Sequence, residues 1–184
     1  MVSNLLGNKA LLFTLANAVI FQLGWFVCIL LGNIWALSFT ALAFIFHFYG
    51  SRLRLADAIA VIVAVVVGLI HDSILLHGGH ILFTETREIS PFWLICLWGL
   101  LGINVNHSLI WIYRRPLLAG LLGAICGPLT YLAGIRLSSA EWTSPLIEVV
   151  PLISVLWLFV LPLHRLLCMR ILGYVQDYKI KLSC

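Results

Sequence analysis

The chain has 184 residues, of which 62% are hydrophobic and only 10% are charged. A typical soluble domain is about 45–50% apolar and about 25% charged, and a chain this short has too little interior to hide the excess. The composition therefore excludes a water-soluble domain and predicts a membrane protein. The net charge of +4 comes from few residues, and no basic run is interleaved with aromatic side chains, so we expect no nucleic-acid partner.

Six apolar segments follow one another, and each approaches the roughly 20 residues that a helix needs to cross a bilayer. They predict an all-α membrane protein with six transmembrane helices, in a single integral membrane domain covering residues 1–184. The expected spans are residues 11–31, 34–49, 57–76, 92–113, 117–136 and 146–166, and residues 167–184 form a basic cytoplasmic tail. The pair Gly32-Asn33 predicts a tight turn between the first two spans.

The distribution of basic residues predicts the orientation, because cytoplasmic loops carry an excess of Lys and Arg. With six spans, only Arg87 and Arg136 of the 11 basic residues fall on one side. The other side receives Lys9, Arg52, Arg54, Arg114, Arg115, Arg165, Arg170, Lys179 and Lys181. This split predicts a six-helix membrane protein with both termini in the cytoplasm (N-in, C-in).

Small residues four apart form a stripe on two of the expected helices, and each stripe ends in a polar side chain. Such stripes let helix backbones approach closely in lipid. They consist of Ala60, Ala64, Gly68 and Asp72 in the third segment, and of Ala119, Gly123, Gly127 and Tyr131 in the fifth. We therefore expect Asp72 and Tyr131 to face the bundle interior. Gly127-Pro128 is expected to interrupt the fifth helix and to border a pocket beside Asp72.

The rise per residue in a helix places the polar side chains in two layers. The outer layer is expected to hold His71, Asp72, Tyr131 and Glu148, and the inner layer Asn17, His47, Asn104 and His107, with Ser108 beside them. Asn106 is expected to point the other way, and His164 to lie at a membrane interface. His77 and His80 are expected at the outer surface, where Gly78-Gly79 ends the helix.

No cofactor is expected from the motifs. The five cysteines lack zinc-type spacing, and no HExxH or GxSxG motif occurs. His77 and His80 are separated by a helix-breaking pair of glycines, so this histidine-rich stretch is a weak metal site. A haem or a metal ion held by His47 and His107 stays open as an alternative.

Five stretches together resemble one known family. They are NAVIFQLGW (17–25), GLIHDSILLHGG (68–79), SPFWLICLWGLLG (90–102), NHSLIWI (106–112) and GPLTYLAGIRL (127–137). The chain resembles the bacterial inner-membrane family catalogued as domain of unknown function 2878. The positions that match its pattern are Asn17, Gln22, Trp25, Asp72, Pro91, Trp93, Trp98, His107, Ser108, Trp111, Gly127, Pro128 and Tyr131. The resemblance implies a membrane architecture and assigns no activity.

Three functions stay open at this level. The first is a membrane protein that binds or translocates a small or lipidic ligand through a polar core. The second is a membrane-embedded lipid-modifying enzyme with Asp72 or His107 as general acid–base. The third is a structural or accessory subunit, in which the polar side chains only join helices. Candidate ligand-binding residues are Asn17, His71, Asp72, Asn104, His107, Ser108 and Tyr131. Expected partners are membrane lipids, with a second copy or a membrane enzyme as alternatives.

Overall fold

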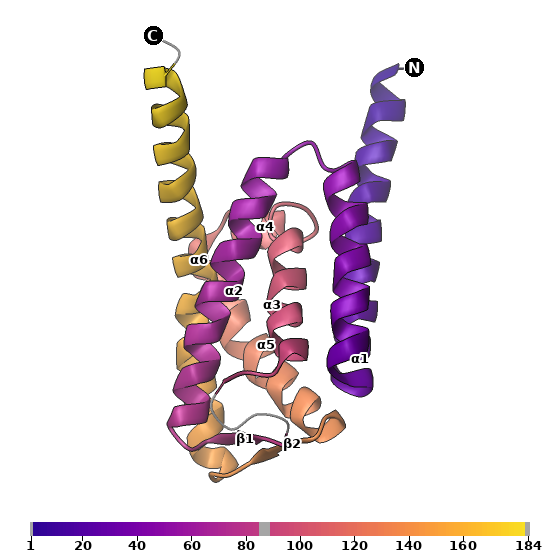
Figure 1. Cartoon of the computed structure of the whole chain (residues 1–184). Coiled ribbons are helices and arrows are strands. Elements are labelled where there is room, and N and C mark those ends of the chain that lie inside the picture. The colour runs from indigo at the N-terminus through magenta and orange to yellow at the C-terminus, as the bar shows by residue number, and fades with distance from the viewer. Residues whose placement is uncertain (1, 85–88, 183–184) are drawn as a thin grey trace.

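The protein is a bundle of long helices in a computed structural model (Figure 1). The backbone is described for residues 2–84 and 89–182, and the side chains for residues 8–84 and 89–176. The helices are α1 (Val2–Gly50), α2 (Arg54–His77), α3 (Phe92–Asn104), α4 (Ile110–Tyr113), α5 (Pro116–Leu137) and α6 (Leu146–Leu182). Two strands, β1 (Ile81–Phe83) and β2 (Ala140–Trp142), complete the described elements. The chain is all-α apart from these short strands, as the sequence predicts.

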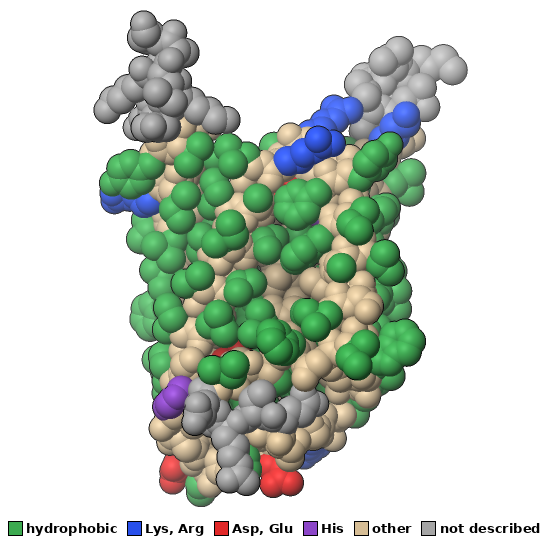
Figure 2. All heavy atoms as spheres, in the orientation of Figure 1, with side chains coloured by type: hydrophobic (Ala, Val, Ile, Leu, Met, Phe, Trp, Pro, Cys, Tyr) green, Lys and Arg blue, Asp and Glu red, His purple; other side chains and the backbone are tan. Residues whose placement is uncertain are grey.

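Four helices of the described chain are long and apolar enough to cross a membrane, namely α1, α2, α5 and α6. Large apolar side chains cover the bundle, and Tyr49, Leu117 and Ile147 are each more than 80% exposed. Figure 2 shows green hydrophobic side chains over the middle of one face, with blue Lys and Arg side chains near the end that holds the termini. A surface of this kind suits lipid and would be unstable in water.

Helix α1 is divided at Gly32, where the expected turn occurs. Gly32 has φ 77° and ψ −171°, a left-handed conformation that is strained for any residue with a Cβ atom. The two arms of α1 lie side by side (Figure 1), and Phe13 on the first arm stacks on Phe46 on the second, with ring centroids 6.1 Å apart. The element therefore contains the first two expected segments as a helical hairpin.

The fourth expected segment is not one continuous helix. Helix α3 ends at Asn104, turns occupy residues 105–109, and α4 begins at Ile110. Asn104 Nδ2 donates a hydrogen bond to the Leu100 carbonyl oxygen, and Ser108 Oγ donates to Asn104 Oδ1. Asn and Ser side chains compete with the backbone for hydrogen bonds, which explains why the helix ends within this polar stretch.

The small-residue stripes face the bundle interior, as expected. Ala60, Ala64 and Ala119 are 1–2% exposed. Helix α2 packs on α3 and α6, and α5 packs on α6. A Cβ atom at Gly123 would lie 2.7 Å from the Trp157 carbonyl oxygen, so glycine is what permits the close approach of α5 to α6.

Two helices run further than the sequence predicts. Helix α5 continues through Gly127-Pro128 without ending, so the expected interruption is wrong. Close packing on α6 holds α5 together there, although Pro128 has no N–H to donate to the preceding turn. Helix α6 continues through most of the expected tail, to Leu182.

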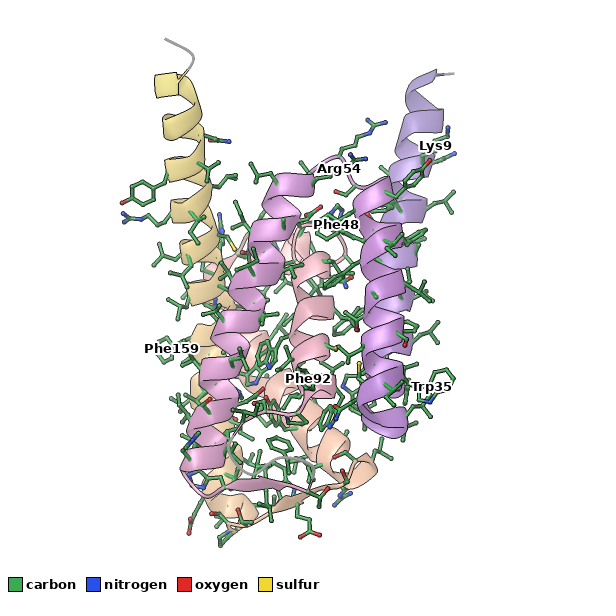
Figure 3. The ribbon with its side chains drawn as sticks, in the orientation of Figure 1. Lys9, Trp35, Phe48, Arg54, Phe92 and Phe159 are labelled. Carbon is green, nitrogen blue, oxygen red and sulfur yellow. The ribbon has the colours of Figure 1, made fainter. Side chains whose placement is uncertain are left out.

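The end of the bundle opposite the termini carries a small antiparallel sheet (Figure 1). Strand β1 pairs with β2, with Ile81 opposite Trp142 and Phe83 opposite Ala140. The strands come from the two longest polar connections, 77–91 and 137–145. Figure 3 places Trp35 and Phe92 toward this end and Lys9 and Arg54 toward the other.

Candidate functional site

Helix α2 carries two buried carboxylates, one near each end. Asp57 is fully buried and Asp72 is 2% exposed. They are 15 residues apart, which corresponds to about 22 Å along a helix. Each is the centre of a separate group of polar side chains. We call the group around Asp57 the inner cluster and the group around Asp72 the outer cluster.

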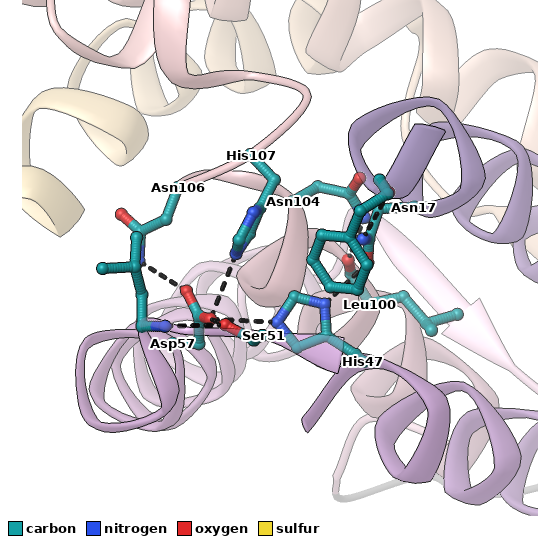
Figure 4. A network of polar contacts seen from close by, with 10 residues as sticks. Asn17, His47, Ser51, Asp57, Leu100, Asn104, Asn106 and His107 are labelled. Carbon is teal, nitrogen blue, oxygen red and sulfur yellow. Dashed lines mark hydrogen bonds and ion pairs between the residues drawn. The ribbon is translucent and has the colours of Figure 1, made fainter. Parts of the chain in front are cut away.

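The inner cluster joins two histidines through one carboxylate oxygen (Figure 4). His47 Nε2 and His107 Nε2 each lie 3.1 Å from Asp57 Oδ2. Ser51 Oγ donates a hydrogen bond to the same oxygen. Asn106 Nδ2 donates to the other oxygen, Oδ1, at 3.0 Å. The members come from the end of α1, the start of α2 and the turns after α3.

Asn17, on the first arm of α1, fixes the orientation of one imidazole. Its Nδ2 donates to the Phe13 carbonyl oxygen at 2.8 Å, so its Oδ1 faces His47 Nδ1 at 2.6 Å. His47 Nδ1–H must therefore donate to Asn17 Oδ1. This leaves His47 Nε2 directed at Asp57.

Sequence reasoning found part of the inner cluster. The expected proximity of Asn17, His47 and His107 is confirmed. Asn104 lies beside them, but its hydrogen bonds go to Leu100 and Ser108.

Two members of the inner cluster were not expected. Asn106 was predicted to point away, which is wrong, because the break after Asn104 turns it toward Asp57. Asp57 itself was missed. The signal was present, since Asp57 lies three residues before Ala60 and so continues its buried face.

The outer cluster joins α2, α3 and α5 around Asp72. Trp98 Nε1 donates to Asp72 Oδ2 at 2.8 Å, and the Tyr131 hydroxyl donates to Asp72 Oδ1. His71 Nδ1 lies 2.9 Å from the same Oδ1 and 3.1 Å from the Tyr131 hydroxyl. The carboxylate is thus held by fixed donors from α3 and α5, with the His71 imidazole of α2 beside it.

Most of the outer layer is arranged as predicted. Asp72, His71 and Tyr131 come together. Glu148 does not join them: it is exposed in the first turn of α6, because the outer end of this helix reaches past the cluster. Trp98 was not predicted as a partner, although it shares the family pattern with Asp72.

Two buried nitrogen atoms beside the outer cluster have no hydrogen-bond partner among the described residues. They are His71 Nε2 and Trp157 Nε1. The Trp157 ring stacks on Trp98, with centroids 5.3 Å apart and planes at 17°. Buried polar atoms are normally paired, so such atoms often mark a place where another molecule binds.

A groove of about 260 Å³ lies next to the outer cluster. Trp98, Tyr131 and Trp157 form part of its wall, and the remaining lining is almost entirely apolar. Cys126 and Thr130 also line it and are exposed, so the groove opens on the side of the bundle. The pocket expected beside Asp72 thus lies next to two of its hydrogen-bond partners, while Asp72 itself is behind them.

His164 forms a third, smaller polar contact. The Tyr113 hydroxyl donates to His164 Nδ1 at 2.8 Å, and His164 Nε2–H donates to the Ala60 carbonyl oxygen at 2.9 Å. His164 is 3% exposed, so it is buried between helices, and its expected depth at a membrane interface stays a prediction. By contrast, His77 is exposed at the end of α2, as predicted.

The inner cluster is also the group of side chains best suited to hold a metal ion. One ligand atom each from His47, Asp57 and His107 lies within 4.8 Å of the others. The outer cluster offers one imidazole, and its remaining partners, a tryptophan and a tyrosine, act there as hydrogen-bond donors.

A family profile described as "Protein of unknown function (DUF2878)" matches residues 14–163. The chain belongs to this family. The matched part contains both clusters and the groove. Searches of curated proteins and of solved structures find no match. The family therefore supports the architecture, and the function has to be inferred from the clusters and the groove.

Proposed function

We propose that the protein is a six-span bacterial inner-membrane protein that binds the hydrocarbon chain of a lipid in the groove beside the outer cluster. The observation that carries the proposal is the groove itself. It is open on the side that faces lipid, it is apolar, and it ends against buried polar side chains. Ligand pockets typically combine an apolar lining with a few polar groups in this way.

Six spans are supported by the division of α1. Its first arm, from residue 8 to residue 31, would be about 36 Å long, and its second arm, from 33 to 50, about 27 Å. Each is close to the hydrocarbon thickness of a bilayer. The apolar α3 and the following turns and α4 supply a further crossing. The beginning of α1 and the end of α6 lie at the same end of the bundle (Figure 1). The excess of basic residues at that end supports its assignment to the cytoplasm.

A hydrocarbon chain fits the groove better than a polar ligand does. The lining side chains are mainly leucine and aromatic residues, and the hydroxyl of Thr130 is already used in a hydrogen bond to the Cys126 carbonyl oxygen. A polar molecule would lose its hydration there without compensation. The volume of about 260 Å³ suits a single chain and not a whole lipid.

The polar wall gives the groove a place for the more polar part of such a ligand. Trp157 Nε1 is a buried donor with no partner among the described residues. A carbonyl or hydroxyl oxygen on the ligand would satisfy it. The hydrogen bonds of Asp72 to Trp98 and Tyr131 keep this wall rigid, which lowers the entropic cost of binding.

A photoreactive phospholipid tests the proposal. The full chain is placed in vesicles that contain a phospholipid with a diazirine on one acyl chain, and crosslinked peptides are mapped. Crosslinks are expected on the segment of α5 from residue 122 to 131. Cys126→Trp should reduce them several-fold, because Cys126 is exposed at the groove and a large ring there fills it.

Ile125→Trp is the matched control. Ile125 is the neighbouring residue, is 61% exposed and does not line the groove, so the same ring should leave the crosslinks unchanged. Equal labelling of wild type and Cys126→Trp would contradict binding in the groove. The orientation is tested separately with a reporter protein fused after the final residue. Its activity shows whether that end of the chain lies in the cytoplasm or the periplasm.

A further inference from the structure

We propose that the inner cluster is a site for a divalent transition-metal ion such as Zn²⁺ or Fe²⁺, with His47 Nε2, His107 Nε2 and Asp57 Oδ2 as its protein ligands. The site is separate from the groove and goes beyond lipid binding. The three ligands come from α1, α2 and the turns after α3, so the ion would join three parts of the chain.

The distances between the three side chains suit a common ion. Both imidazole nitrogens are 3.1 Å from Asp57 Oδ2. Ligand atoms at about 2.0–2.1 Å from a tetrahedral or octahedral ion are themselves about 2.9–3.4 Å apart. The two imidazole nitrogens lie within 4.8 Å of each other, so an ion needs them to move closer together around Asp57 Oδ2. The two imidazole centroids are 4.9 Å apart, and both rings converge on one oxygen atom, which leaves no room for a haem between them.

The types of ligand also favour such an ion. Imidazole nitrogen suits zinc, iron, copper and nickel, whereas calcium and magnesium prefer oxygen. Two histidines and one carboxylate form a set that leaves coordination positions open for water or another molecule. His107 keeps 11% of its side chain exposed, so the site is not sealed from outside.

The hydrogen bonds around the ligands support this assignment. Histidines that bind a metal normally donate their other ring N–H to an acceptor, which fixes the ring. His47 does this through Nδ1 and Asn17. Asn106 donates to Asp57 Oδ1, while Oδ2 accepts from Ser51 and is the oxygen that both imidazoles approach.

The electrostatics of the inner cluster favours the binding of a cation. With its proton on Nδ1, a neutral His47 directs the lone pair of Nε2 at a carboxylate oxygen 3.1 Å away. Two electron-rich atoms in this position repel each other, and burial strengthens the repulsion. A metal ion between the two atoms replaces this repulsion with attraction. A proton on Nε2 would do the same, so the test must separate the two.

Metal uptake by the purified full chain provides that test. The protein is extracted in detergent, treated with a chelator, and titrated with Co²⁺ and then Zn²⁺. We expect one Co²⁺ per chain, with visible absorption bands that Zn²⁺ abolishes, and one Zn²⁺ per chain by elemental analysis. Asp57→Asn and His107→Gln should each weaken binding more than tenfold. Asn17→Ala, which removes only the support of His47, should weaken it about 10–100-fold.

Asp72→Asn is the matched control, because Asp72 is an equally buried carboxylate on the same helix with one histidine beside it. It should bind one metal ion with the affinity of the wild type. If Asp57→Asn does not give a monodisperse protein, His107→Gln decides, because His107 lies on the turns after α3 and is partly exposed. A wild-type protein that takes up neither ion, or a monodisperse Asp57→Asn or His107→Gln that binds like the wild type, would overturn the proposal and leave a protonated cluster instead.

Discussion

The inner and outer clusters use the same kind of residue in opposite ways. Both are built on a buried aspartate of α2. Asp72 is surrounded by fixed donors, a tryptophan N–H and a tyrosine hydroxyl, which satisfy its charge. Asp57 accepts from Ser51 and Asn106 and also faces two imidazole nitrogens, which can act as lone-pair ligands. A buried carboxylate is therefore a helix-to-helix contact in one setting and a candidate ligand in the other, and its partners decide which.

The largest difference between the two clusters is expected when each carboxylate is removed in turn. Asp72→Ala leaves the Trp98 N–H without an acceptor and the Tyr131 hydroxyl with only His71 Nδ1 at 3.1 Å, and a buried unsatisfied donor costs about 1–3 kcal/mol. We expect the free energy of unfolding in mixed detergent micelles to fall by about 3 kcal/mol. Asp57→Ala, measured with a chelator present, should cost less, because the freed imidazoles can accept from Ser51 and Asn106. Equal losses would mean that both aspartates are only helix contacts.

The next largest effect is expected from metal binding, which should raise the free energy of unfolding only through the inner cluster. An ion that binds only the folded state, at 100 times its Kd, adds about 2.7 kcal/mol to the free energy of unfolding. We expect this increase with Zn²⁺ for the wild type and for Asp72→Asn. It should vanish for Asp57→Asn in the same unfolding assay. An increase that survives in Asp57→Asn would place the ion elsewhere.

The two stacked tryptophans allow a finer comparison within the outer cluster. Trp98→Phe removes the donor to Asp72, whereas Trp157→Phe removes an N–H that has no partner among the described residues. Both changes remove a similar amount of ring. Trp98→Phe should therefore cost about 1 kcal/mol more in the unfolding assay, the usual net contribution of one hydrogen bond. A larger loss for Trp157→Phe would contradict this account of the outer cluster.

The smallest effect is expected at Glu148, which was assigned to the outer layer from its position in the sequence. It is exposed, so Glu148→Gln should change the free energy of unfolding by no more than about 0.5 kcal/mol. A change in the free energy of unfolding as large as that of Trp98→Phe would show that Glu148 takes part in the outer cluster.

The sequence predicted what depends on helical periodicity. Helix positions four apart share a face, so the stripe from Ala60 to Asp72 was correctly placed inside the bundle, and Tyr131 was placed with it. The turn at Gly32 was also predicted, because glycine followed by asparagine marks a tight turn.

What the sequence did not reveal depends on where helices end and which helices meet. Asn106 was misplaced because the segment from 92 to 113 was treated as one helix, and side-chain competition for backbone hydrogen bonds ends it early. Asp57 was missed because it follows Arg52 and Arg54 and resembles a solvated helix start. The pairing of β1 with β2 joins loops that are distant in sequence, and neither loop indicates it alone.

The position of the two aspartates at opposite ends of α2 has a mechanical consequence. A shift of one residue along this helix would turn it by about 100° and move both carboxylates away from their partners at once. The helix therefore has a single allowed register against α3, set by two points about 22 Å apart. Because both carboxylates are held, α2 cannot slide along its axis or rotate about it. While one carboxylate keeps its partners, the register is kept, so a conservative change at Asp72 leaves the geometry around Asp57 in place.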